Sequence, residues 1–84
     1  MNKRRLLQKA LNSPQNMRFS EMIVLVEAFG FQLSRSSGSH RIFTHPDLKE
    51  LLNLQEVDGK AKPYQVRQFL RIVEKYDLQL GEDE

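Results

Sequence analysis

The tripeptide Gly38-Ser39-His40 is the part of this sequence best suited to chemistry, because it joins a flexible Ser/Gly segment to a histidine. Imidazole is the side chain that takes up and releases protons near neutral pH. Arg35 precedes the tripeptide and Arg41 follows it, so two permanent positive charges lie close by in the chain. A proton-transfer group beside two cations fits chemistry on a phosphate backbone, where arginines neutralise charge on the phosphate or on a pentavalent centre.

Cleavage of RNA is one such reaction, since it needs no metal if the 2′-OH attacks the adjacent phosphate. A base must take the proton of the 2′-OH, and an acid must protonate the leaving 5′-oxygen. His40 can do either, but a single imidazole does not easily do both at once. We therefore expect a second group or water to share the proton transfer.

The other histidine, His45, is a poorer candidate for this chemistry. It precedes Pro46, which holds it in an extended conformation at the end of the strand that begins at His40. In a regular strand, five positions place the two histidines on opposite faces. We predict that His45 is a turn residue.

Four other residues are candidates for contact with the phosphate backbone. Gly38 allows a close approach of the chain to a phosphate and Ser39 can donate a hydrogen bond, although a plain hairpin loop explains both equally well. Lys60 and Lys62 precede Pro63, which fits the first turn of a helix. A helix start attracts phosphate through its free N–H groups, and two lysines strengthen that attraction.

The bulk composition excludes several classes of site. A chain of 84 residues forms one small domain. It has no cysteine and only two histidines, so we expect no disulfide, no structural zinc site and no other cofactor. No apolar run approaches the length of a transmembrane helix, and no signal-peptide pattern follows the basic start. We expect a cytoplasmic protein without a membrane association.

Charge is distributed unevenly along the chain. Residues 1–76 hold thirteen basic and seven acidic side chains, whereas residues 77–84 hold four acidic and no basic ones. A basic body favours a polyanionic partner, most often nucleic acid. The alternative is that the charge serves only solubility.

Three segments have apolar residues at the spacing of an amphipathic helix, namely residues 3–11, residues 20–29 and a segment that begins at Pro63. In the first, Leu7, Ala10 and Leu11 form the apolar stripe. Ser20 is a good N-cap for the second helix, which Gly30 ends.

Three strands are expected between the last two helices, over residues 31–35, 40–44 and 51–55. A turn follows the second strand, and residues 56–62 read as a polar loop. The fold class is therefore α+β, with a three-stranded antiparallel sheet, two helices on one of its faces and an extra N-terminal helix. We expect a basic helical extension over residues 1–17, a domain over residues 18–78 and an acidic tail over residues 79–84.

The segment from about Phe19 to Leu78 resembles the HicA toxins of bacterial toxin–antitoxin systems. The resemblance rests on the helix ending at Gly30-Phe31, on Gly38-Ser39-His40 with Phe43 and His45-Pro46, and on Gly59-Lys60-Ala61-Lys62-Pro63 with Arg67 and Leu70 behind it. The family is similar in fold to double-stranded-RNA-binding domains. The chain departs from the family in its basic helix at residues 3–11 and in a Leu-rich third strand.

This resemblance implies a function. Members of the family are mRNA-cleaving toxins, each silenced by a HicB antitoxin, and their motif histidine corresponds to His40. We therefore expect a metal-independent endoribonuclease toxin of a type II system, with mRNA and a HicB-type antitoxin as partners. The RNA-binding residues would be Arg35, Gly38, Ser39, Arg41, Lys60 and Lys62. The alternative is a non-catalytic RNA-binding module of the same fold, which would have no need of His40.

Overall fold

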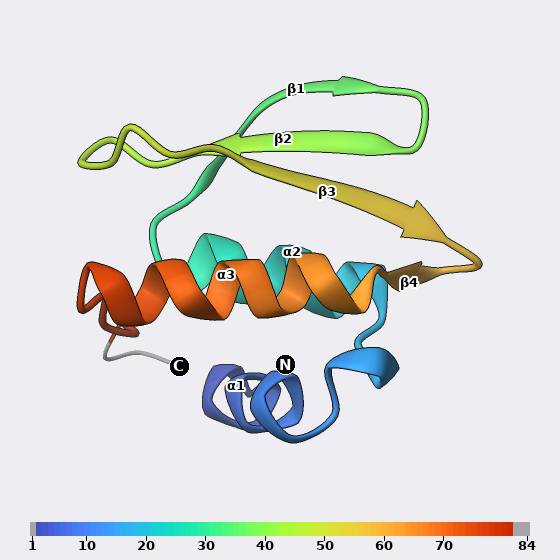
Figure 1. Ribbon diagram of the computed structural model, residues 1–84, viewed down its shortest axis with the longest axis horizontal. Coiled ribbons are helices and arrows are strands. Elements are labelled where there is room, and N and C mark those ends of the chain that lie inside the picture. Colours follow the sequence, from blue (N-terminus) through green and yellow to red (C-terminus); the bar gives the residue numbers. More distant parts are fainter. Residues whose placement is uncertain (1, 82–84) are drawn as a thin grey trace.

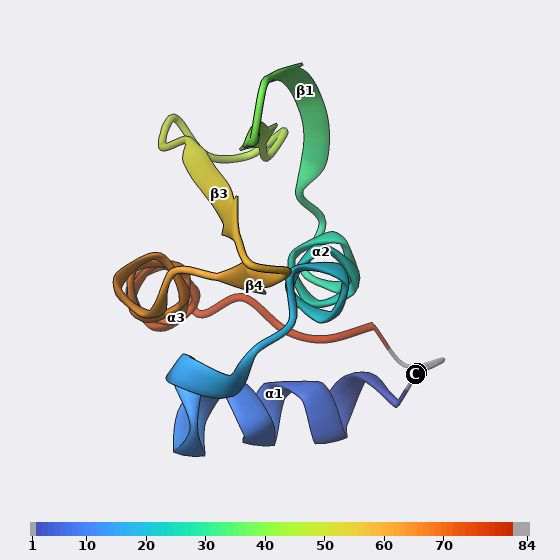
Figure 2. The same ribbon diagram turned by 90° about the vertical axis from the view of Figure 1, so that its right-hand side faces the viewer.

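A computed structural model describes residues 2–81 of the chain as a sheet stacked on helices (Figure 1). The elements in chain order are α1 (Lys3–Asn12), the 3-10 turn η1 (Pro14–Asn16), α2 (Phe19–Ala28), β1 (Gln32–Ser37), β2 (His40–Thr44), β3 (Leu52–Val57), β4 (Lys60–Ala61) and α3 (Pro63–Lys75). The helices α2 and α3 lie beneath the sheet, and α1 lies below them on the side away from the sheet (Figures 1 and 2). The fold is α+β, as predicted, and is compatible with the double-stranded-RNA-binding type.

The sheet has four antiparallel strands within residues 2–81, in the order β1-β2-β3-β4, so the prediction of three strands is wrong. The segment predicted as a polar loop extends β3 to Val57 and returns as β4. Asp58 and Gly59 form the turn between them, with φ of 53° and 79°. Two successive residues with positive φ give the hairpin turn that matches the twist of paired strands, and Asp-Gly is a favoured pair for it.

Alternation along β2 and β3 divides the sheet into two faces. Phe43, Leu52 and Leu54 are buried in the hydrophobic core that includes residues of α2 and α3. Cross-strand partners lie on the same face, so the register assigns the other positions to the surface that no described element covers (Figures 1 and 2). We call this surface the open face. Its residues are Arg35, Ser37, His40, Ile42, Thr44, Asn53 and Gln55.

The apolar stripes predicted for the two core helices are confirmed. Met22, Leu25, Val26 and Phe29 are all buried on the α2 side. In α3, the Phe69 ring meets that of Phe29 edge-on, with 5.5 Å between the ring centroids. The opposite side of α3 exposes Arg67, Arg71 and Lys75.

The first helix is part of the packed body of the protein. Leu6 and Ala10 are buried in the same hydrophobic cluster as α2 and α3, and Leu7 packs partly against it. Leu11, which the spacing placed on the apolar stripe, is 54% exposed, so its predicted position is wrong. Because Leu6 also lies one turn before Ala10, the stripe is shifted around the helix relative to the expected one.

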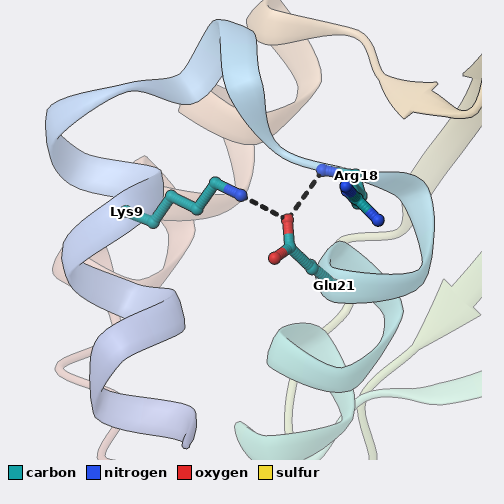
Figure 3. A network of polar contacts seen from close by, with 3 residues as sticks. All are labelled: Lys9, Arg18 and Glu21. Carbon is teal, nitrogen blue, oxygen red and sulfur yellow. Dashed lines mark hydrogen bonds and ion pairs between the residues drawn. The ribbon is translucent and has the colours of Figure 1, made fainter. Parts of the chain in front are cut away.

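A carboxylate joins α1 to the start of α2 (Figure 3). Glu21 Oε1 accepts hydrogen bonds from Lys9 Nζ at 2.8 Å and from the backbone N–H of Arg18 at 2.9 Å. The helix therefore begins at Phe19, with Arg18 as its N-cap, and the prediction of Ser20 as N-cap is wrong. A glutamate at the third helical position commonly bonds back to the cap in this way.

The environment of Glu21 lowers its pKa. Burial alone would raise the pKa of this carboxyl, but the hydrogen bonds from Lys9 and from the Arg18 N–H, together with both positive charges, outweigh it. A carboxyl whose pKa is lower in the folded state stabilises the fold above the pKa of the unfolded chain. That contribution is lost as the pH falls below about 4.5, the ordinary value, through the lower pKa of the folded state.

We expect Glu21→Gln to lower the free energy of unfolding at neutral pH by about 1 kcal/mol, because it removes the ion pair and weakens the helix cap. The deficit should shrink as the pH falls below 4.5, where Glu21 of the unmodified protein takes up its own proton. Urea unfolding at a series of pH values measures both effects. Glu27→Gln is the matched control, since Glu27 is an exposed residue of the same helix. A deficit that is equal in the two variants, or independent of pH, would contradict this account.

Candidate active site

The turn between β1 and β2 is tighter than the predicted loop. β1 continues to Ser37, which pairs with His40, so only Gly38 and Ser39 form the turn. Gly38 has a backbone φ of 58°, which residues with a side chain rarely adopt. A Cβ at this position would nevertheless meet no atom within 4 Å. The carbonyl of Ser39 accepts a hydrogen bond from the N–H of Glu56 at 3.0 Å. The turn is thus held by β3 while its tip is open to solvent.

His40 is the first residue of β2 and lies half-buried on the open face. Its Nδ1 lies 3.0 Å from Oδ1 of Asn53 on β3. Within residues 2–81, no hydrogen bond or ion pair involves Nε2 of this ring. Sequence reasoning did not identify Asn53, although a polar residue between two core leucines in a strand marks a position on the outer face.

The two arginines near the motif lie on different faces. Arg35 pairs with Ile42, which places it on the open face two positions along from His40. Within the described residues, no hydrogen bond or ion pair involves its guanidinium group. Arg41 alternates to the other face, where its Nη1 donates to the carbonyls of Gly38 at 2.9 Å and His40 at 3.2 Å. The structure therefore brings Arg35 beside the histidine and uses Arg41 to brace the turn.

The two lysines occupy different elements. Lys60 lies in β4, exposed, and pairs with Val57, whose position on β3 alternates onto the open-face side. Lys62 is the N-cap of α3, and Pro63 begins the helix as predicted. The ammonium group of Lys62 lies 6.0 Å from the ring centroid of Tyr64, which is 55% exposed. An exposed aromatic ring beside a cation is a surface on which bases can stack.

A distant segment adds a third positive charge at this position. The N–H of Phe19 donates to the carbonyl of Gly59 at 2.9 Å, and the N–H of Ala61 donates to that of Met17 at 3.1 Å. These bonds place Arg18 opposite Lys60 as a bridge partner. Sequence reasoning missed Arg18 as a site residue, since no local pattern reports a pairing between segments about forty residues apart.

These groups gather at one end of the molecule. The β1–β2 turn, β4 and the starts of α2 and α3 are all on the right-hand side of Figure 1, with the turn at the top and β4 at the level of the helices; Figure 2 views this side directly. Both helix starts and the cations Arg18, Lys60 and Lys62 attract anions here and outnumber the exposed carboxylates of Glu56 and Asp58. We call this region the electropositive end. His40 lies next to it on the open face, because its strand starts at the same turn.

His45 is held in the connection after β2, on the core side of the sheet. Its Nδ1 accepts a hydrogen bond from the N–H of Asp47 at 3.1 Å, and its Nε2 donates to the carbonyl of Phe29 at 3.1 Å. The ring packs edge-on against Phe31, with centroids 5.1 Å apart. A Cβ at Gly30 would lie 2.8 Å from Nε2, so glycine is needed there for space as well as for its φ of 98°. The predicted turn position is confirmed, and neither ring nitrogen is left for chemistry.

Comparison with known families identifies the family to which the chain belongs. The family model described as the HicA toxin of bacterial toxin-antitoxin matches residues 19–74, which include His40, Lys60 and Lys62. The chain belongs to the HicA toxin family. Membership implies that this HicA toxin has an antitoxin partner. The match begins at the first residue of α2, so α1 lies outside it.

No curated protein and no solved structure matched this HicA toxin sequence. None of the helices formed by residues 2–81 is long and apolar enough to cross a membrane.

The two histidines of this HicA toxin should differ sharply in their effect on stability. We expect His45→Ala to lower the free energy of unfolding by about 2–3 kcal/mol, because it removes the donor of a partly buried carbonyl and a packed ring. His40→Ala removes one exposed hydrogen bond and should cost less than about 1 kcal/mol. Urea unfolding followed by circular dichroism compares them. Equal losses of unfolding free energy in the two variants would mean that His40 also has a structural role.

Proposed function

We propose that this protein is a toxin that cleaves mRNA in the cytoplasm as a metal-independent endoribonuclease, with His40 as the general acid or base. A HicB-type antitoxin silences it by covering the open face. The observation that supports this proposal most is the state of His40. It lies on an uncovered surface, inside the family match, with one ring nitrogen bonded and the other without a partner in residues 2–81.

The proposed reaction uses His40 as a base in its first step. The 2′-oxygen forms a bond to the adjacent phosphorus while its proton passes to the imidazole, and the bond from phosphorus to the 5′-oxygen breaks. Water supplies the proton for the leaving 5′-oxygen. The products are a 2′,3′-cyclic phosphate and a 5′-OH end, and no metal takes part. The exposed Arg35 guanidinium on the same face would stabilise charge on the pentavalent centre.

RNA binding in this proposal depends on the electropositive end beside His40. Lys60 and Lys62, with Arg18 opposite Lys60, would contact phosphates at the starts of the two helices. Gly38 and Ser39 at the open tip of the turn would allow close approach of the backbone. Arg41 would act there mainly by bracing this turn, since its Nη1 bonds to two carbonyls of the turn region.

The second candidate function is a non-catalytic RNA-binding module with the same basic end. The exposed Tyr64 ring beside Lys62 favours it as much as it favours a nuclease, since base stacking serves both. The two candidates differ in whether His40 is required.

We expect His40→Ala to lower the rate of RNA cleavage at least about a hundredfold, the effect of losing a general acid or base. Cleavage of a labelled single-stranded RNA with EDTA present, with analysis of the product ends, measures it. Induced expression in a bacterial host should stop growth for the unmodified protein and not for His40→Ala.

Thr44→Ala is the matched control for this experiment, since Thr44 lies on the same face of the same strand at its far end. Circular dichroism of His40→Ala checks that the fold is intact. Unchanged cleavage by folded His40→Ala would refute the proposed role. An absence of cleavage and of growth arrest in the unmodified protein would favour the binding module.

The lysines have a separate test. We expect the double variant Lys60→Ala with Lys62→Ala to weaken RNA binding and to reduce the slope of log K against log salt concentration by about 1.4, since each lost contact with a single strand is worth about 0.7. Lys49→Ala with Arg71→Ala removes the same charge from exposed residues outside β4 and the helix starts, and serves as the control. An equal change in both double variants would mean that only net charge matters.

A further inference from the structure

The protein holds its two imidazole rings in different ways. His45 accepts a hydrogen bond at Nδ1 and donates one at Nε2, so both of its nitrogens are used by the backbone. His40 has one partner, Asn53, and that partner is a side chain on the neighbouring strand. His45 therefore stabilises a turn through both ring nitrogens. His40 is oriented through one nitrogen and can still exchange a proton at the other.

We propose that Asn53 is a positioning residue for His40: it holds the ring with Nδ1 protonated and leaves Nε2 as the atom that takes and returns the proton. The amide oxygen of asparagine is only an acceptor, so at 3.0 Å from Nδ1 it requires a proton on that nitrogen. The hydrogen bond that one ring nitrogen makes determines which tautomer is present. This inference rests on the proposed function and names the residue that prepares its base.

The same hydrogen bond persists through the proposed reaction. Nδ1 carries a proton both in the neutral ring and in the charged ring, so Oδ1 accepts in both states. The proton of the 2′-OH therefore arrives at Nε2 without breaking the contact with Asn53. It leaves later from the same atom to solvent, which restores the starting tautomer.

The placement of Asn53 is built into the sheet. His40 pairs with Gln55 and Ile42 pairs with Asn53, so His40 and Asn53 are diagonal neighbours on the open face. Leu52 and Leu54, on either side of Asn53, are buried and fix which way the strand faces. Asparagine is disfavoured in strands, yet Asn53 lies in the part of β3 that pairs with β2. Contact with His40 supplies a reason for asparagine at this position.

Within residues 2–81, the charged side chains that the strand register places on the open face near this pair are cations. The register places Arg35 of β1 on that face. It places Lys60 of β4 on the same side of the sheet, opposite Val57, whereas Arg41 of β2 lies on the other face. From β3, Asn53 and Gln55 are neutral, and Glu56 alternates away. A carboxylate introduced at position 53 would be an anion beside His40, and it would favour the charged ring.

The first test reads the tautomer directly by ¹⁵N NMR of the His40 ring in the full chain. The unmodified protein should show the neutral ring protonated at Nδ1, and Asn53→Ala should lose this preference. Asn53→Asp should restore it, because a carboxylate also accepts from Nδ1. A ring protonated at Nε2 in the unmodified protein, or one unaffected by Asn53→Ala, would overturn the proposal.

The second test uses the pH profile of RNA cleavage. Asn53→Ala should lower kcat about tenfold, as expected for one neutral hydrogen bond, with little change in KM. Asn53→Asp should recover activity and move the acidic limb of the profile to higher pH. Thr44→Ala, on the same face, should change neither. A purely structural role for Asn53 would leave the pH profile of the folded variants unmoved and would overturn the proposal.

The two proposals fail in distinguishable ways. If the NMR results are as expected but the unmodified protein does not cleave RNA, the nuclease function is wrong and the orientation of His40 by Asn53 stands. If RNA cleavage depends on His40 but neither the tautomer nor the pH profile depends on Asn53, the role of Asn53 is wrong.

Discussion

The pairing of β2 with β3 is the constraint on which the site depends. Phe43, Leu52 and Leu54 are at most 1% exposed, and their burial determines which face of each strand points into the core. Side chains alternate along a strand, so a slip of one residue would carry the whole apolar set out of the core. The same burial therefore holds His40 and Asn53 outward and side by side. Core packing and site geometry have one physical cause here.

A second junction attaches the electropositive end to this sheet. β3 leaves β2 after Glu56, and there Gln65 of α3 accepts a hydrogen bond from the N–H of Gln55 at 2.8 Å. Gln65 is 4% exposed, and its side-chain oxygen supplies a partner for the partly buried N–H of Gln55. The junction ties the start of α3, with Lys62 as its cap, to the part of β3 that pairs with His40. The start of α3, which carries Lys62, is thus linked through one buried side-chain amide to the strand that pairs with His40.

Local patterns in the sequence predicted what depends on neighbours within one element. The stripes of α2 and α3, Gly30 as the end of α2 and the strand at His40 all come from periodicity or from backbone freedom, and the structure has them. Features that depend on contacts between elements were not predictable in this way. Asn53 matters because of a residue thirteen positions earlier, and Arg18 because of a pairing with Lys60. The prediction for Leu11 was wrong because the apolar residues of this helix form two possible stripes, one with Leu11 and one with Leu6. Only contact with α2 and α3 determines that the stripe with Leu6 is buried.

The position of α1 explains how so small a chain can leave one face of its sheet uncovered. A domain of this size can bury only a small apolar area, and an uncovered sheet face reduces that area further. Leu6 and Ala10 of α1 cover the helices from the side away from the sheet, and Lys9 fixes that helix to Glu21. The added burial thus comes on the side of the molecule where it does not obstruct the open face. Had α1 packed across the sheet instead, it would have buried Ile42 and with it His40. The extension therefore supports the core without closing the surface on which His40 and Asn53 lie.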